Sequence, residues 1–159
     1  MPNTHSAHRY QEVEVKTATA LELVVLLYDA AIAGLQKAQE HIASRDIANR
    51  ARCLNKVSSI LTELQANLNF EAGGTVAASL DRLYHYMKNR IFEATMQQDA
   101  APLKEVAGLL SNLRSAWAQV AQNETRQTIR QAAGIKPTAL PSASSLPTAS
   151  PLAGLNITA

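Results

Sequence analysis

Apolar residues recur at steps of three and four along most of the chain, which is the spacing of helices packed lengthwise against one another. One such stripe is formed by Leu103, Val106, Leu110, Leu113, Trp117 and Val120. Two further stripes are formed by Ile47, Leu54, Val57, Leu61, Leu64 and Leu68, and by Val76, Leu80, Leu83, Tyr84, Met87 and Ile91. The alternation typical of a strand is confined to residues 13–16. The pattern therefore predicts an all-α protein.

Capping and turn signals set the limits of the first two predicted helices. Thr19 and Glu22 have the spacing of a capping box, so the first helix is predicted to run from Thr19 to about Ala43. A short turn follows, and the second helix is predicted from about Asp46 to Asn69.

Glycine and proline set the limits of the other two. The stretch Glu71–Gly74 is predicted to be a break, because glycine commonly follows the end of a helix. The third helix is then predicted over Thr75–Gln98. The fourth begins near Ala101, since Pro102 is tolerated in a first helical turn, and ends between residues 122 and 133.

Four helices of about 20–25 residues with short links predict antiparallel neighbours, in an up-down-up-down four-helix bundle. Residues 19–133 form this bundle, and residues 1–18 are predicted to be a short N-terminal cap segment. Residues 134–159 hold four of the six prolines, many Ser and Ala residues and a single charged residue. That composition predicts a disordered C-terminal tail.

The stretch Glu22–Leu35 has more apolar surface than one bundle helix needs, because only Glu22 and Asp29 are charged. An inward face is supplied by Leu21, Val24, Val25, Tyr28, Ile32 and Leu35, which leaves Leu23, Leu26, Leu27, Ala30 and Ala31 as surplus. The later helices add Cys53, Ile60, Tyr86 and Phe92. This helix could simply be the most central one, but no position in a four-helix bundle is fully surrounded. The surplus therefore indicates a groove that binds an amphipathic helix of a partner.

Charge and composition exclude several classes of function. Fifteen Lys and Arg residues against thirteen Asp and Glu give a net charge of +2, which argues against nucleic-acid binding. The single cysteine, Cys53, suits a reducing cytoplasm. The polar start lacks the apolar core of a signal peptide, and no apolar run approaches the ~18 residues of a membrane helix. A cytoplasmic protein without membrane insertion is predicted.

Little in the sequence points to enzyme chemistry. His5 and His8 lack further metal ligands, and the Glu-x-x-His pairs of di-metal bundles do not occur. A Gly-rich phosphate loop and a Gly-x-Ser-x-Gly nucleophile elbow are also absent from the sequence. The prediction is a protein that is not an enzyme, with no cofactor, no metal and no small-molecule substrate.

One alternative rests on His85, which is followed by Lys88 at a spacing that resembles the histidine phosphotransfer domains. His85 lies off the apolar stripe and is predicted to be exposed. Asn89 stands where those domains have glycine, and a solvated histidine on a polar face beside Asp81 and Lys88 is the favoured interpretation. A modest basic face formed by Arg45, Arg50, Arg52 and Lys56 is likewise predicted to be only solvated.

Three blocks of sequence resemble the FliS family, the bacterial flagellin-specific secretion chaperones. The first block comprises Tyr10-Gln11, Lys16-Thr17-Ala18 and residues 23–32, which read LVVLLYDAAI. The second comprises residues 68–74, which read LNFEAGG, with Leu80, Leu83-Tyr84 and Tyr86-Met87; the third comprises Leu109-Leu110, Leu113-Arg114 and Ala116-Trp117. Together they span residues 10–122. The family's Ser-Pro pair at the start of the first helix is Thr19-Ala20 here, and its Gly after Tyr-Asp is Ala30.

The resemblance implies a cytoplasmic export chaperone. It would bind the disordered C-terminal segment of flagellin in apolar grooves, prevent premature polymerisation and deliver flagellin to a component of the flagellar export gate. The N-terminal segment around Tyr10 would cover the groove in the free protein. The residues predicted for the groove or its cover are Tyr10, Leu23, Leu26, Leu27, Tyr28 and Ile32, with Tyr84 and Met87 in second rank because they fit the core equally well. A histidine phosphotransfer bundle that uses His85 and a self-associating structural bundle are the alternatives.

Overall fold

The computed structural model describes the backbone of residues 4–134 and the side chains of residues 20–134. The chain forms four helices, α1 (Thr4–Ala43), α2 (Ile47–Ala66), α3 (Phe70–Gln97) and α4 (Ala101–Ala132). This confirms the all-α prediction. The tail predicted for residues 134–159 lies outside the described residues except for Gly134.

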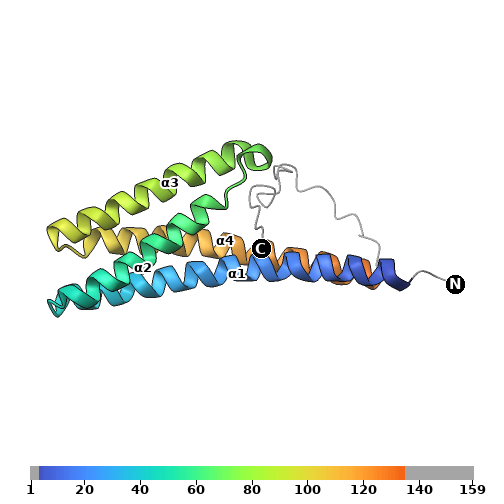
Figure 1. Ribbon diagram of the computed structural model, residues 1–159, viewed down its shortest axis with the longest axis horizontal. Helices are drawn as coiled ribbons and strands as arrows, with labels where there is room; N and C mark the ends of the chain where they lie inside the picture. Colours follow the sequence, from blue (N-terminus) through green and yellow to red (C-terminus); the bar gives the residue numbers. More distant parts are fainter. Residues whose placement is uncertain (1–3, 135–159) are drawn as a thin grey trace, which may run out of the picture.

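The helices form a four-membered bundle in which each helix packs against two others (Figure 1). Helix α1 lies beside α2 and α4, and α3 lies beside the same two helices, so α1 and α3 are diagonal partners. Figure 1 shows the chain reversing its direction at each of the three connections. It also shows α1 and α4 continuing together past the connection between α2 and α3. The predicted four-helix bundle is confirmed.

Helix α1 begins much earlier than predicted. It is one continuous helix of 40 residues, and Thr19 and Glu22 lie within it, so the predicted capping box is wrong. The reason is visible in residues 4–18, which contain neither glycine nor proline and so carry no residue that stops a helix. The predicted division after residue 18 therefore does not coincide with a helix end.

Asparagine and aspartate caps set the start of the next two helices. The Asp46 carboxylate accepts a hydrogen bond from the Asn49 backbone N–H at 3.1 Å, and α2 begins one residue later, as predicted. The Asn69 side chain accepts a hydrogen bond from the Ala72 N–H at 3.0 Å, so α3 begins at Phe70. The predicted start of the third helix at Thr75 is therefore wrong by five residues, because Asn69 caps a turn upstream of the glycines. The predicted break itself is present, as the non-helical residue Gly74.

The second glycine of that stretch bends the helix instead of ending it. Gly74 has φ 48° and ψ −123° inside α3, a conformation that side chains with a Cβ rarely adopt. Helix α4 follows its prediction: Pro102 lies in the first turn, and the helix ends at Ala132.

The core is continuous through the bundle and contains most of the predicted stripes. Its largest fully buried side chains are Tyr28, Tyr84, Leu35, Leu61, Met87, Leu103, Leu110, Val57 and Val106. Two members of the predicted stripes, Ile47 and Val76, are exposed instead. Ile47 lies in the first turn of α2, ahead of the buried part of its stripe. After the kink in α3 the buried position is Ala77, one residue later than predicted, and Val76 therefore points to solvent. Ile60, predicted to be surplus, belongs to the core.

Candidate binding groove

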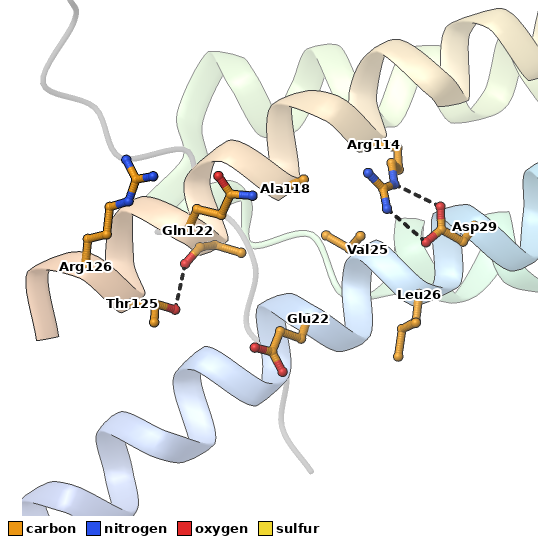
Figure 2. A pocket seen from close by; sticks show the side chains of 10 residues that line it. Glu22, Val25, Leu26, Asp29, Arg114, Ala118, Gln122, Thr125 and Arg126 are labelled. Atoms are coloured by element: carbon orange, nitrogen blue, oxygen red, sulfur yellow. Dashed lines mark hydrogen bonds and ion pairs between the residues drawn. The ribbon is translucent and has the colours of Figure 1, made fainter. Parts of the chain in front are cut away.

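An open groove of about 610 Å³ lies between α1 and α4. Figure 2 shows the side chains from both helices that line it. They are Glu22, Val25, Leu26 and Asp29 from α1, and Arg114, Ala118, Ala121, Gln122, Thr125 and Arg126 from α4. Both sets follow three-four spacing, so each helix contributes one face to the groove.

One end of the groove is defined by an ion pair between α1 and α4 (Figure 2). The Arg114 guanidinium donates to both carboxylate oxygens of Asp29, with Nε–Oδ1 at 2.9 Å and Nη2–Oδ2 at 3.2 Å. The hydrogen bond to Asp29 raises the pKa of Arg114. This two-point contact fixes the rotation of α1 relative to α4, because the planar guanidinium fork accepts few other geometries.

The surplus apolar surface of α1 is partly confirmed. Leu26 is 61 % exposed at the groove, and Leu23, three residues earlier, is 49 % exposed. Leu27 and Ile32 are half-buried and pack against the core. Ala31 is fully buried, because it faces the centre of the bundle. Leu23, Leu26 and the small residue Ala30 are therefore the members of the predicted surplus that are exposed.

The remaining predicted site residues are placed differently. Tyr28, Tyr84 and Met87 are buried in the core, and the Tyr10 side chain lies outside the described side chains. The hydroxyl groups of Tyr28 and Tyr84 are hydrogen-bonded to each other across the diagonal of the bundle. Burial raises the pKa of both phenols. In the closed bundle these three residues support the helices that carry the groove, and direct binding by them stays a prediction.

The α4 side of the groove was not predicted from the sequence. Its floor contains Ala118 and Ala121, which follow the core residue Trp117. Small residues beside an apolar stripe leave space between two helices, so this spacing was the available signal. It is weak, because alanine is also the most favourable residue for any helix surface.

A second group of exposed apolar side chains lies on α3. Tyr86, Phe92 and Met96 are 44 %, 64 % and 68 % exposed, in agreement with the prediction that Tyr86 and Phe92 are surplus. The Tyr86 hydroxyl donates to Glu105, and this hydrogen bond, together with Arg90, lowers the pKa of the Glu105 carboxylate. Tyr86 is thus anchored to α4.

His85 is exposed, as predicted, with a side-chain exposure of 63 %. Its Nε2 lies 4.0 Å from an Asp81 carboxylate oxygen. Lys88 does not stand free beside it, because its ammonium group donates to Gln65 on α2 at 2.6 Å. Gln65 in turn donates to Asp81 at 2.6 Å. These contacts hold the Lys88 ammonium group between α2 and α3, where it pairs with Gln65 instead of offsetting charge on His85.

The predicted basic face is smaller than expected. Arg50 is only 7 % exposed, whereas Arg45, Arg52 and Lys56 are exposed. Arg50 lies in the first turns of α2, and its Nε has no hydrogen-bond partner among the described residues. The assignment of Arg50 to a solvated face is therefore wrong.

None of the helices within residues 4–134 is both long enough and apolar enough to cross a membrane. Among the side chains of residues 20–134, His, Cys, Asp and Glu form no group of three or more that could hold a metal ion.

Comparison with known proteins identifies the family. The sequence profile of the family described as "Flagellar protein FliS" matches residues 2–124. The flagellar secretion chaperone FliS of Salmonella typhimurium is 34 % identical over 120 residues, which cover 75 % of this chain and 89 % of that protein. The FliS of Bacillus subtilis is 32 % identical over 117 residues, which cover 74 % of this chain and 86 % of that protein. The FliSB of Pseudomonas aeruginosa is 33 % identical over 106 residues, which cover 67 % of this chain and 84 % of that protein. From the extent of these matches and the four-helix bundle, we conclude that the chain belongs to the FliS family of flagellar secretion chaperones.

Proposed function

We propose that this chain is a cytoplasmic export chaperone that binds the disordered C-terminal segment of flagellin. The segment folds into helices along apolar grooves of the bundle. While it is bound, flagellin cannot polymerise prematurely, and the chaperone delivers it to the flagellar export gate. The observation that carries this proposal is the groove between α1 and α4, with Leu26 exposed at its edge. The related chaperones are named for flagellar secretion, which agrees with an exported flagellar partner.

The physical basis of binding is apolar burial. A segment that wraps a folded partner covers on the order of 2,000 Å² or more. Each Å² of apolar surface removed from water contributes roughly 25 cal/mol, and ordering the segment costs at least a few kcal/mol of that gain. The chaperone must therefore hold apolar surface that its own core does not use. Leu23 and Leu26 provide such surface.

The alternatives are less favoured. The family match supports a chaperone, and Lys88 is held by Gln65 and is not poised beside His85 as a phosphotransfer site requires. The sequence has no Gly-rich phosphate loop, so release of flagellin is assigned to exchange or to pulling by the export machinery.

A charge placed at the groove tests the proposal. Leu26→Asp is expected to weaken binding of a flagellin C-terminal peptide by about tenfold or more, because a carboxylate cannot be buried against an apolar helix without a partner. Titration calorimetry measures the affinity. Leu27 is a poorer choice, since it packs against the core and a charge there is expected to destabilise the bundle as well.

Ile47→Asp is the matched control. Ile47 is 60 % exposed, nearly the same as Leu26, but it lies at the start of α2, near the opposite end of α1. We expect this variant to bind within about twofold of the wild type, and both variants to keep their helical circular dichroism. Normal binding by a folded Leu26→Asp protein would remove this groove from the flagellin site.

A further inference from the structure

The groove lies close to the point where the described chain ends. Its α4 wall runs from Arg114 to Arg126, and α4 ends at Ala132. Ala118, in the floor, precedes Gly134 by 16 positions, which corresponds to about 24 Å along a helix. The chain continues for 25 residues beyond Gly134, and these lie outside the described residues and beyond the family match, which ends at residue 124.

The sequence of this continuation fits the chemistry of the groove. Its only charged residue is Lys136, and its densest apolar stretch is Leu152–Ile157, with leucines at positions 152 and 155. The groove itself carries two acidic and two basic side chains, Glu22, Asp29, Arg114 and Arg126, and two of these already pair with each other. A groove with no net charge and an apolar floor gains nothing from a charged ligand, and it suits a neutral, apolar one.

The length of the connection also fits. Seventeen residues separate Gly134 from Leu152. A flexible chain of that length has a root-mean-square span of about 23 Å, and the four prolines in this one make it more extended. The connection is therefore long enough to cover the ~24 Å to Ala118, and a linker that is not much longer than its span keeps the effective concentration high. A tethered segment then acts at roughly millimolar concentration, which a free ligand has to exceed.

We propose that Leu152–Ile157 of this same chain occupies the groove between α1 and α4 when no partner is bound. The leucines at 152 and 155 contact the floor formed by Val25, Leu26, Ala118 and Ala121. The segment is thus an intramolecular ligand that shields Leu26 from water. This inference stands independently of flagellin; under the proposed function, it makes the tail a competitor that an incoming helix must displace.

Disulfide trapping in the full chain tests the proposal. Cys53→Ala removes the native thiol, and Ala118→Cys is combined with Asn156→Cys, which leaves both leucines of the segment in place. The control pairs Ala116→Cys with the same Asn156→Cys. Ala116 is exposed and lies two positions away, on the opposite side of α4 from the groove, and the two thiols must approach to within about 7 Å between Cα atoms to join.

Under mild oxidation we expect the intramolecular disulfide to form at least about tenfold faster with position 118 than with position 116. Adding Leu152→Ser and Leu155→Ser to the position-118 protein is expected to reduce its rate to that of the control, and circular dichroism checks that each variant stays folded. Equal rates at the two positions would overturn the proposal. Disulfide-linked dimers as the main product would also overturn it, because they would place the segment of a second copy in the groove. Flagellin is absent from this assay, so its outcome is separate from that of the peptide titration.

Discussion

At the scale of single residues, the closest approach of two helices depends on Gly34. A Cβ atom built at this position would lie 2.6 Å from Cγ2 of Val57, which is fully buried in α2. No pair of real side chains tolerates such a distance, so α1 and α2 can pack this closely only because position 34 has no side chain.

Gly34→Ala is therefore expected to destabilise the protein by about 1–3 kcal/mol, the usual cost of overpacking a core, although alanine favours helix. Chemical denaturation measures the change. Gly108→Ala in α4 is the matched control, because a Cβ there meets nothing within 4 Å. This control is expected to be stabilised by about 0.5–1 kcal/mol. If both variants gain stability, the contact at Gly34 does not limit the packing of α1 on α2.

The sequence alone could not decide which of two neighbouring leucines belongs to the groove and which to the core. Leu26 and Leu27 are equally apolar and adjacent, yet one is exposed at the groove and the other packs against the core. Periodicity places them 100° apart on the helix, but it does not say where the neighbouring helix ends. That information comes from the positions of α2 and α4 relative to α1.

At the scale of elements, side-chain caps set the starts of α2 and α3, whereas α4 begins without one. Asn69 caps α3 and makes the stretch Phe70–Gly73 a single helical turn ahead of the kink at Gly74. The family-like sequence LNFEAGG is thus a cap, a turn and a bend, where a simple break was predicted.

Asn69→Ala is expected to cost about 1 kcal/mol of stability, because the Ala72 N–H loses its partner and a one-turn segment has little else to hold it. Hydrogen exchange should show faster exchange of the amides of residues 71–73, with little change in α4. Asn69→Asp is the control, since aspartate caps helices about as well and should retain the protection. Unchanged exchange in Asn69→Ala would mean that packing alone maintains this turn.

At the scale of the whole molecule, Tyr28 and Tyr84 link the two helices that lie diagonally opposite in the bundle. They connect α1 to its diagonal partner α3 through hydroxyl groups at the centre of the core. Burial raises the pKa of both phenols above the ordinary value of 10.0. Just above pH 10, both tyrosines are therefore still neutral in the folded protein but ionised in the unfolded chain.

This difference predicts a loss of stability at high pH. Below pH 10 both states hold the protons and the stabilisation is complete. Above pH 10 the unfolded state releases protons that the folded state keeps, so the free energy of unfolding falls by up to about 1.4 kcal/mol per pH unit for each tyrosine. Urea unfolding between pH 8 and pH 11 measures the slope.

The double variant Tyr28→Phe with Tyr84→Phe is expected to show a shallower slope than the wild type above pH 10. Phenylalanine keeps the ring that fills the core and removes the ionisable group from both states. Parallel slopes in the two proteins would show that other groups cause the alkaline loss of stability.

The sequence by itself determined the number of helices, most of the buried stripes and the surplus of apolar surface on α1, because three-four periodicity is a local property of the chain. Leu103, Val106 and Leu110 are buried as their spacing predicted. Only the tertiary structure decided that α1 continues from Thr4 through the predicted cap, and that the groove has α4 as its second wall. The ion pair between Asp29 and Arg114 joins residues 85 positions apart, and no local pattern specifies such a pair. The groove forms where one face of α1 meets one face of α4, and that depends on how the four helices pack together.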